Sequence, residues 1–198
     1  MQGILTNLRS TVIAGFVLTV ILFIIVSPLA GTGFALDYAW TAFLFRWLHV
    51  ISGVMWIGLL WYFNFVQIPT VPKIEPAEHR AAISKYIAPE ALFWFRYSAL
   101  ATVVTGLILA YMNGYLLPAL TLRPGTIAIG IGMWLALIMA FNVWFIIWPN
   151  QKKALGLVQA TPEEKAQAGR LAMLTSRANT MLSIPMLYCM VAQQNAGL

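Results

Sequence analysis

The sequence has 198 residues, of which 61% are hydrophobic and only 9% charged, and its mean hydropathy is +0.80. These values exclude a water-soluble globular domain and are typical of a chain that crosses a bilayer several times. The net charge of +6 does not indicate nucleic-acid binding, because basic loops at the anionic cytoplasmic face of a membrane account for it. The single cysteine excludes an intrachain disulfide, a zinc cluster and an iron–sulfur site, and the sequence has no C-x-x-C-H motif for covalent haem attachment.

Five apolar stretches are long enough to cross a bilayer, and no alternating strand pattern accompanies them. The first is as long as a full span, so we expect a retained helix rather than a cleaved signal peptide. The sequence therefore predicts an all-α fold, a single membrane domain (1–198) built as a bundle of five transmembrane helices. The spans are predicted at residues 11–29, 40–68, 92–112, 126–148 and 174–191.

Several local signals mark the ends of these helices. Pro69 and Pro72 are expected to end the second span, and Pro149 the fourth, because proline interrupts helical hydrogen bonding. The segment AEHRAAISKY, before the third span, is predicted to form a short amphipathic helix on the surface. The segment TPEE, which begins at Thr161, has the pattern of a helix start with proline in the first position.

Lysine and arginine are distributed unequally between the two ends of the spans, which predicts the orientation of the chain. Arg46 and Arg123 are expected on one side, with Arg46 buried near it. The positive-inside rule then predicts a cytoplasmic N-terminus and an external C-terminus at Leu198. The other side would hold Arg9, Lys73, Arg80, Lys85, Arg96, Lys152, Lys153, Lys165, Arg170 and Arg177.

The second span carries ionisable side chains, which inside a membrane are costly and by default functional. On a helix, Arg46, His49, Gly53 and Trp56 fall on one face. Imidazole is a usual axial ligand of haem iron, and an arginine fork suits a haem propionate. Glycine leaves room for a flat macrocycle, and the tryptophan would wall the site. These residues predict a haem b site with His49 as the metal ligand. The alternative is a histidine hydrogen-bonded inside the bundle, with the arginine reaching to the headgroups.

A second axial ligand would have to come from another helix. Met133, in the fourth span, and Met186, in the fifth, are the methionines at the corresponding depth. Methionine opposite histidine is a known ligation of haem iron. Methionine is also a common filler of apolar packing, so the alternative for both residues is a structural one.

Polar side chains also gather at the cytoplasmic ends of the last two spans. Amides and hydroxyls at this depth need partners, and the two helices could satisfy one another. We expect Asn142 and Asn179 to face each other, mainly as a structural contact; the alternative is a functional site. The predicted polar cluster consists of Asn142, Asn150, Gln151, Ser176, Arg177 and Asn179.

Four segments carry a family resemblance: RWLHVISGVMWIGLLWYFNFVQ, ALFWFRY, NVWFIIWPNQKK and SRANTMLSIPML. They resemble the N-terminal membrane domain of bacterial membrane-bound urate oxidase, mainly through N-x6-P-N-Q-K-K followed by S-x2-N-x5-P. They are also similar to membrane haem proteins of the protoporphyrinogen oxidase type and to copper-resistance membrane domains. The resemblance implies an oxidoreductase of the bacterial inner membrane that passes electrons to a C-terminal cytochrome c domain.

This chain differs from the pattern that the resemblance implies. It ends at Leu198, so we expect a short form that lacks the cytochrome c domain. Phe93, Gly130 and Ala178 stand where the resemblance implies further histidines, which leaves His49 as the ligand that carries over.

Two classes of function follow from these observations. The first is a membrane haem b protein in bacterial electron transfer or in the oxidation of a small molecule, with a cytochrome c as partner. The second is a non-catalytic accessory subunit that packs against a larger membrane complex. Its contact face could include the small residues Ala128, Gly130 and Gly132, which could equally pack within the bundle.

Overall fold

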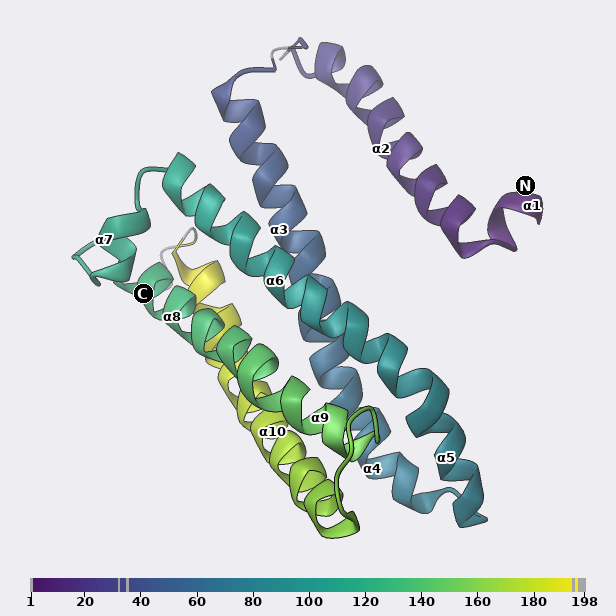
Figure 1. Ribbon diagram of the computed structural model, residues 1–198. Coiled ribbons are helices and arrows are strands. Elements are labelled where there is room, and N and C mark those ends of the chain that lie inside the picture. Colours follow the sequence, from purple (N-terminus) through teal and green to yellow (C-terminus); the bar gives the residue numbers. More distant parts are fainter. Residues whose placement is uncertain (1, 32, 35, 194, 196–198) are drawn as a thin grey trace. The chain divides into compact units, whose positions relative to one another are not determined.

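The computed structural model describes residues 2–31, 33–34, 36–193 and 195, and within these it contains helices and no strand (Figure 1). The predicted all-α class is therefore confirmed. Four helical stretches are long and apolar enough to cross a membrane, at residues 8–29, 38–73, 77–112 and 127–154. The fifth predicted span lies within α10 (Pro162–Ala192), whose polar residues keep it outside this group. The predicted external end, Leu198, lies outside the described residues.

The chain divides into two compact units, residues 1–41 and 42–198. The first contains α1 (Gln2–Leu5), α2 (Leu8–Leu29) and the beginning of α3 (Tyr38–Trp61). Asn7 caps α2, since its side-chain oxygen accepts a hydrogen bond from the backbone N–H of Ser10 at 3.1 Å. Most of the apolar side chains of α2 are exposed, and the helix is long and apolar enough to cross a membrane.

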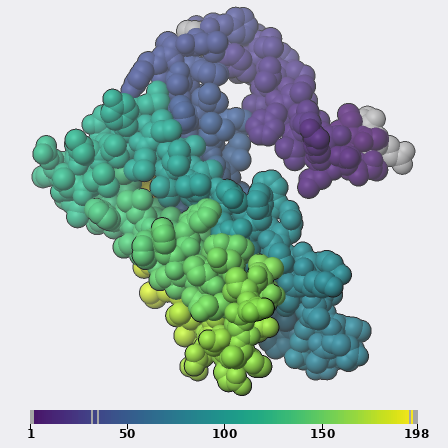
Figure 2. All heavy atoms as spheres, viewed as in Figure 1, coloured from purple at the N-terminus to yellow at the C-terminus, as the bar shows by residue number. Residues whose placement is uncertain are grey.

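The second unit is a bundle in which α10 runs beside α8 (Ile127–Phe141) and α9 (Trp148–Ala154), and α6 (Ala88–Met112) packs on α8; in Figure 1, α6 passes in front of α3. Its core contains side chains from every one of the long helices. In the space-filling view the teal atoms of α6 and the green atoms of α8 form a continuous surface (Figure 2). The largest fully buried apolar side chains are Trp56, Leu60, Phe95, Met139 and Val143.

Three π-helical turns interrupt the long helices of this unit. They are η1 (Tyr62–Gln67), η4 (Ile83–Ile87) and η5 (Asn142–Ile147), and each ends two residues before a proline. A proline ring collides with the carbonyl four residues earlier in a regular α-helix. The wider π turn moves that carbonyl away, so the helix passes the proline without ending.

The predicted helix ends at Pro69 and Pro149 are therefore wrong, whereas the second stretch does end at Lys73, directly after Pro72. Past Pro69 the second helical stretch continues through α4 (Ile68–Thr70) and η2 (Val71–Lys73). The fourth continues past Pro149 to the end of α9. Sequence patterns identify the proline as a helix breaker, but the compensating π turn depends on packing around it.

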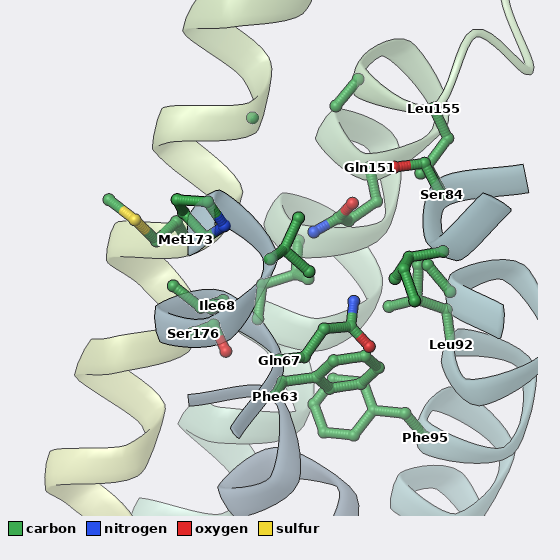
Figure 3. Close-up of a pocket in the computed structure, with 17 residues that line it drawn as sticks. Phe63, Gln67, Ile68, Ser84, Leu92, Phe95, Gln151, Leu155, Met173 and Ser176 are labelled. Atoms are coloured by element: carbon green, nitrogen blue, oxygen red, sulfur yellow. The ribbon is translucent and has the colours of Figure 1, made fainter. Parts of the chain in front are cut away.

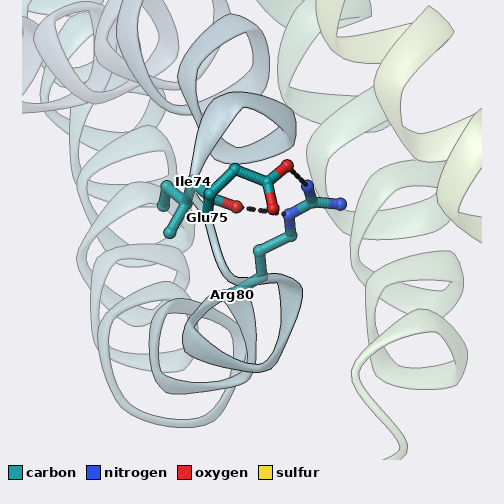
Figure 4. Close-up of polar contacts among 3 residues, drawn as sticks. All are labelled: Ile74, Glu75 and Arg80. Carbon is teal, nitrogen blue, oxygen red and sulfur yellow. Dashed lines mark hydrogen bonds and ion pairs between the residues drawn. The ribbon is translucent and has the colours of Figure 1, made fainter.

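The segment AEHRAAISKY does not form a separate surface helix either. It begins with η3 (Ala77–His79) and α5 (Arg80–Ala82) and continues through η4 into α6, so it is the start of the third helical stretch. The connection before it is held by Arg80, which donates to the carbonyl of Ile74 at 3.0 Å and pairs with Glu75 at 3.2 Å (Figure 4). The Glu75 side chain is 78% exposed and that of Arg80 35%, so solvent screens this ion pair, which orders the loop but contributes little to stability.

The predicted start of the last helix is confirmed. The Thr161 hydroxyl accepts from the backbone N–H of Glu164 at 3.2 Å, and the Glu164 carboxylate accepts from the backbone N–H of Thr161 at 2.8 Å. This reciprocal capping box, with proline in the first turn, begins α10.

The connection between α6 and α8 forms the opposite end of the bundle from α4, α5 and α9 (Figure 1). Gly114, with a φ of +74°, ends α6, and a short helix α7 (Leu116–Leu120) folds back against α8. At Gly130 a Cβ atom would collide with the carbonyl oxygen of Ala119. At Gly132 it would lie 3.2 Å from the Cβ of Cys189. These glycines thus pack within the chain, and they do not provide a contact face for a partner.

Replacing Gly130 by alanine is expected to destabilise the bundle by about 1–3 kcal/mol, because the added methyl meets backbone that cannot move aside cheaply. Higher helix propensity offsets up to about 1 kcal/mol of that loss. Gly132→Ala should cost less, because its new contact is tight but not overlapping. Thermal unfolding in detergent, followed by circular dichroism, measures both. Equal stability of Gly130→Ala and the native protein would contradict the packing described here.

Candidate functional site

A cavity of about 680 Å³ opens between α3, α6, α8 and α10 in the second unit. This volume is in the range of pockets that hold cofactors and other large ligands. Its lining is mostly apolar, with a few polar groups. The residues predicted for a haem site all line it: Arg46, His49, Gly53, Trp56, Met133 and Met186.

His49 is held by helix α6 rather than by any side chain of its own helix. Its Nδ1 lies 2.9 Å from the backbone carbonyl oxygen of Thr102, which can only accept, so Nδ1 carries the proton. The neutral imidazole then has its lone pair on Nε2, the tautomer suited to binding a metal. The ring is half-buried and lines the cavity.

Gly106 of α6 lies directly against the imidazole of His49, and it was not predicted from the sequence. A Cβ at this position would lie 2.8 Å from Cε1 and 3.0 Å from Nδ1 of His49. The ring therefore packs directly on the backbone of α6, which fixes its plane. The signal in the sequence is a lone glycine inside an apolar helix, which often marks a close approach.

The other predicted glycine has a different role. A Cβ at Gly53 would lie 3.8 Å from the Thr102 side chain, an ordinary contact, so helix packing does not require glycine there. Its effect is on the cavity, where the missing side chain leaves space one turn beyond His49.

Trp56 lines the cavity and is fully buried. Its indole Nε1–H has no hydrogen-bond partner in the part of the chain that the structure describes. Buried donors are normally paired, so this one is available to an acceptor on a bound group.

Met133 and Met186 reach the cavity from α8 and α10, and both are buried, at 8% and 5% exposure. Both methionines line the same cavity as His49 but come from other helices. Either could therefore supply its sulfur to a metal bound by the histidine. Both also pack against apolar neighbours, as methionine does without any ligand role.

Arg46 lies at the rim of the cavity and is exposed, not buried as the sequence predicted. Arg46 lies on the same face of α3 as His49, one turn earlier. At this point α3 approaches the connection between α6 and α7. Tyr115, in that connection, also lines the cavity. Burial raises the pKa of the Tyr115 hydroxyl, and the nearby Arg46 charge opposes that shift. The rim thus offers one cation and one neutral hydroxyl.

The polar cluster forms around Asn179, which is fully buried. Asn142 donates to its side-chain oxygen at 2.8 Å, and Asn179 in turn donates to the carbonyl of Met139 at 2.9 Å. The predicted contact between the two asparagines is therefore present. One turn away, Ser176 accepts a hydrogen bond from Asn64 at 2.8 Å. These bonds satisfy polar groups of α10 against η1, α8 and η5.

The remaining members of the predicted cluster lie apart from this network. Asn150 donates to the carbonyl of Ile146 within its own helix at 2.8 Å. Gln151 lines a separate, smaller cavity, and Arg177 is exposed on α10. Two polar residues of this region, Asn64 and Ser183, were not predicted from the sequence. The Ser183 hydroxyl accepts a hydrogen bond from the indole N–H of Trp61 at 3.0 Å.

Replacing Asn142 by leucine is expected to lower stability in detergent by about 0.6 kcal/mol, the average for interhelical hydrogen bonds in membranes, and by no more than about 1.7. The reason is that Asn179 would lose the donor to its buried side-chain oxygen. Asn150→Leu is the matched control, because it removes a bond within one helix only. Thermal unfolding measures both variants. An Asn142→Leu protein with native stability and altered ligand content would contradict a structural role for the pair.

No group of three or more His, Cys, Asp or Glu side chains that could hold a metal ion occurs among residues 2–31, 33–34, 36–193 and 195. A metal bound at His49 would therefore have no cluster of such side chains around it in this part of the chain. A metal that brings its own equatorial ligands, as haem iron does, needs no more than one or two such residues.

Comparison with known proteins gives one match. Residues 119–196 match the family described as urate oxidase N-terminal. Neither a curated protein nor a solved structure matches the chain. The match covers α8, η5, α9 and α10, including both motifs on which the resemblance rests, while His49 lies before it. The predicted resemblance to the urate oxidase N-terminal family is therefore confirmed over residues 119–196.

Proposed function

We propose that this chain is a multi-pass protein of the bacterial inner membrane that binds haem b in the cavity beside His49. It would serve in electron transfer or in the oxidation of a small molecule, with a cytochrome c as the redox partner. The observation that carries the proposal is the convergence of residues from four helices on one cavity, around an imidazole whose free nitrogen is Nε2.

The residues present fit this group. His49 would ligate the iron through Nε2, with Nδ1 held by the Thr102 carbonyl. Met133 or Met186, which line the same cavity, would supply a sulfur ligand or pack against the macrocycle. Arg46 would pair with a propionate at the rim, and the unpaired indole N–H of Trp56 would meet an acceptor. When bound, haem supplies one-electron redox chemistry, and the apolar lining keeps water from it.

The proposal includes α10 as a fifth span. This helix has 31 residues, about 46 Å at 1.5 Å per residue, which exceeds the thickness of a hydrocarbon core. Its buried Ser176, Asn179 and Ser183 are turned toward other helices, where hydrogen bonds satisfy them. The polar residues that lower its hydropathy thus need not face lipid.

Charge supports the orientation proposed for the bundle. The lysines at 73, 85, 152 and 153 lie at the end formed by α4, α5 and α9, whereas Arg123 follows α7 at the other end (Figure 1). The positive-inside rule puts the first end in the cytoplasm. The His49 cavity then lies in the outer half of the membrane, accessible to an external cytochrome.

Replacing Arg46 by leucine is expected to weaken haem retention by no more than about fivefold, because an exposed ion pair contributes about 1 kcal/mol or less. The iron should remain ligated, since His49 is unchanged. Haem transfer to apomyoglobin measures retention, and the Soret position reports ligation. A shifted Soret band in this variant would contradict the assigned roles.

The test of the proposed function is the absorption spectrum of the purified protein, oxidised and then reduced with dithionite. A Soret band and a sharp α-band on reduction are expected. A spectrum with neither, from folded protein purified with haem supplied, would overturn the proposal and favour the accessory-subunit class.

A further inference from the structure

A second cavity, of about 310 Å³, lies further along the same helices, at the end formed by α4, α5 and α9. Figure 3 shows the amide groups of Gln67 and Gln151 reaching into it, with the rings of Phe63 and Phe95 beside Gln67. Ser84 and Ser176 add two hydroxyl groups. Among the described residues, those that line it include no charged side chain. A ligand of this cavity should therefore be neutral, partly apolar and able to form hydrogen bonds.

Two acceptors beside this cavity lack donors. Gln67 Oε1 is buried and has no hydrogen-bond partner within the described part of the chain, and the same holds for Asn64 Oδ1. The amide nitrogen of Asn64 is already used, because it donates to Ser176 Oγ at 2.8 Å and to the Leu60 carbonyl at 2.9 Å. Buried carbonyl oxygens of amides normally accept a hydrogen bond. The missing partner is thus a donor.

The three π turns converge on this cavity. η1 contributes Phe63 and Gln67 to the lining, η4 contributes Ile83 and Ser84, and η5 contributes Ile147. Each turn has a local cause, the proline that follows it. The prolines explain why each π turn forms. They do not explain why π turns from three different helical stretches line the same cavity. π turns occur frequently at functional sites, where they redirect side chains.

We propose that this cavity binds the headgroup of a membrane quinol, a neutral ring with two hydroxyl groups. One hydroxyl would donate to Gln67 Oε1, and the Gln151 amide would donate to an oxygen of the ring. Phe63 and Phe95, whose rings meet edge to face at 5.7 Å, supply an aromatic wall for the headgroup. The apolar tail would pass between the helices into lipid. An anion is disfavoured, because no cation lines the cavity.

The test compares a quinol with an ether that lacks the two hydroxyl donors and carries methyl groups in their place. Decylubiquinol and its dimethyl ether have the same ring and tail, but the ether cannot donate. Isothermal titration of the purified native protein in detergent should give about tenfold tighter binding for the quinol, the effect of one well-made hydrogen bond. Gln67→Met should bind the quinol about as weakly as the ether and leave ether binding unchanged. Gln167→Met, at an exposed position of α10, should bind as the native protein does.

Each other outcome overturns the proposal. Equal binding of quinol and ether would mean that the unpaired acceptors do not recognise the ligand. Quinol binding that is unaltered in Gln67→Met would mean that the ligand binds elsewhere. No quinol binding by the native protein would mean that this cavity is not a quinol site. If Gln67→Met fails to fold, Gln151→Met replaces it, with the same expected loss. The same quinol affinity is expected in His49→Ala, so the result does not depend on haem.

Discussion

Alanine in place of His49 is expected to reduce the bound haem b from about one per chain to nearly none. The reason is that the Thr102 carbonyl holds Nδ1 of His49 and leaves the Nε2 lone pair for the iron, whereas a weakly held methionine does not retain iron alone. The bundle should remain folded, because the substitution enlarges a cavity that already exists instead of creating one in the core. The pyridine haemochrome assay gives haem per protein, and circular dichroism reports folding.

The matched control is His79→Ala. His79 is exposed in the connection before α6, and its loss should leave the haem content unchanged. Imidazole added to His49→Gly should restore part of the Soret band, since a free ligand can occupy the space left by the side chain. Haem that persists at native stoichiometry in folded His49→Ala would mean that the site is elsewhere.

Gly106→Ala is expected to lower haem affinity by about 10- to 100-fold, the usual range for residues that orient a metal ligand. The new Cβ would lie 2.8 Å from Cε1 of His49, so the imidazole must tilt and its hydrogen bond to the Thr102 carbonyl must lengthen. Global stability should change little, because alanine raises helix propensity by up to about 1 kcal/mol at an interior position. Haem titration of the apoprotein, followed at the Soret band, measures the affinity.

Gly15→Ala is the corresponding control, since a Cβ at this position of α2 meets nothing within 4 Å. Its haem affinity should equal that of the native protein. Native affinity in Gly106→Ala would show that the packing of the imidazole on α6 does not hold the ligand in position.

The sequence predicts the helices of this protein well, because membrane spans are determined by long apolar runs that need no tertiary information. It fails where helices are modified by their surroundings. Proline patterns predicted ends at Pro69 and Pro149, and the structure instead has π turns that carry the helices past both. The segment 77–86 has the composition of a surface helix, but it joins α6 without a break.

The residues of the candidate site also fall into two groups, those that the sequence predicts and those that it does not. Arg46, His49, Gly53 and Trp56 share a face of one helix, so periodicity alone groups them. Helical periodicity could not identify Thr102 and Gly106, the residues of α6 that hold His49 in position. Thr102 acts through its backbone carbonyl, which every residue has, and Gly106 acts through an absent side chain. The polar cluster also includes Asn64 from η1, because sequence spacing within α10 does not reveal which helix packs against Ser176.

A structure of the native protein, purified from cells supplied with haem, tests the central claim most directly. We expect one macrocycle between α3, α6, α8 and α10, with its iron bound to Nε2 of His49 and a propionate near Arg46. A macrocycle bound at any other place, or lipid in that cavity in a protein that contains stoichiometric haem, would contradict the account.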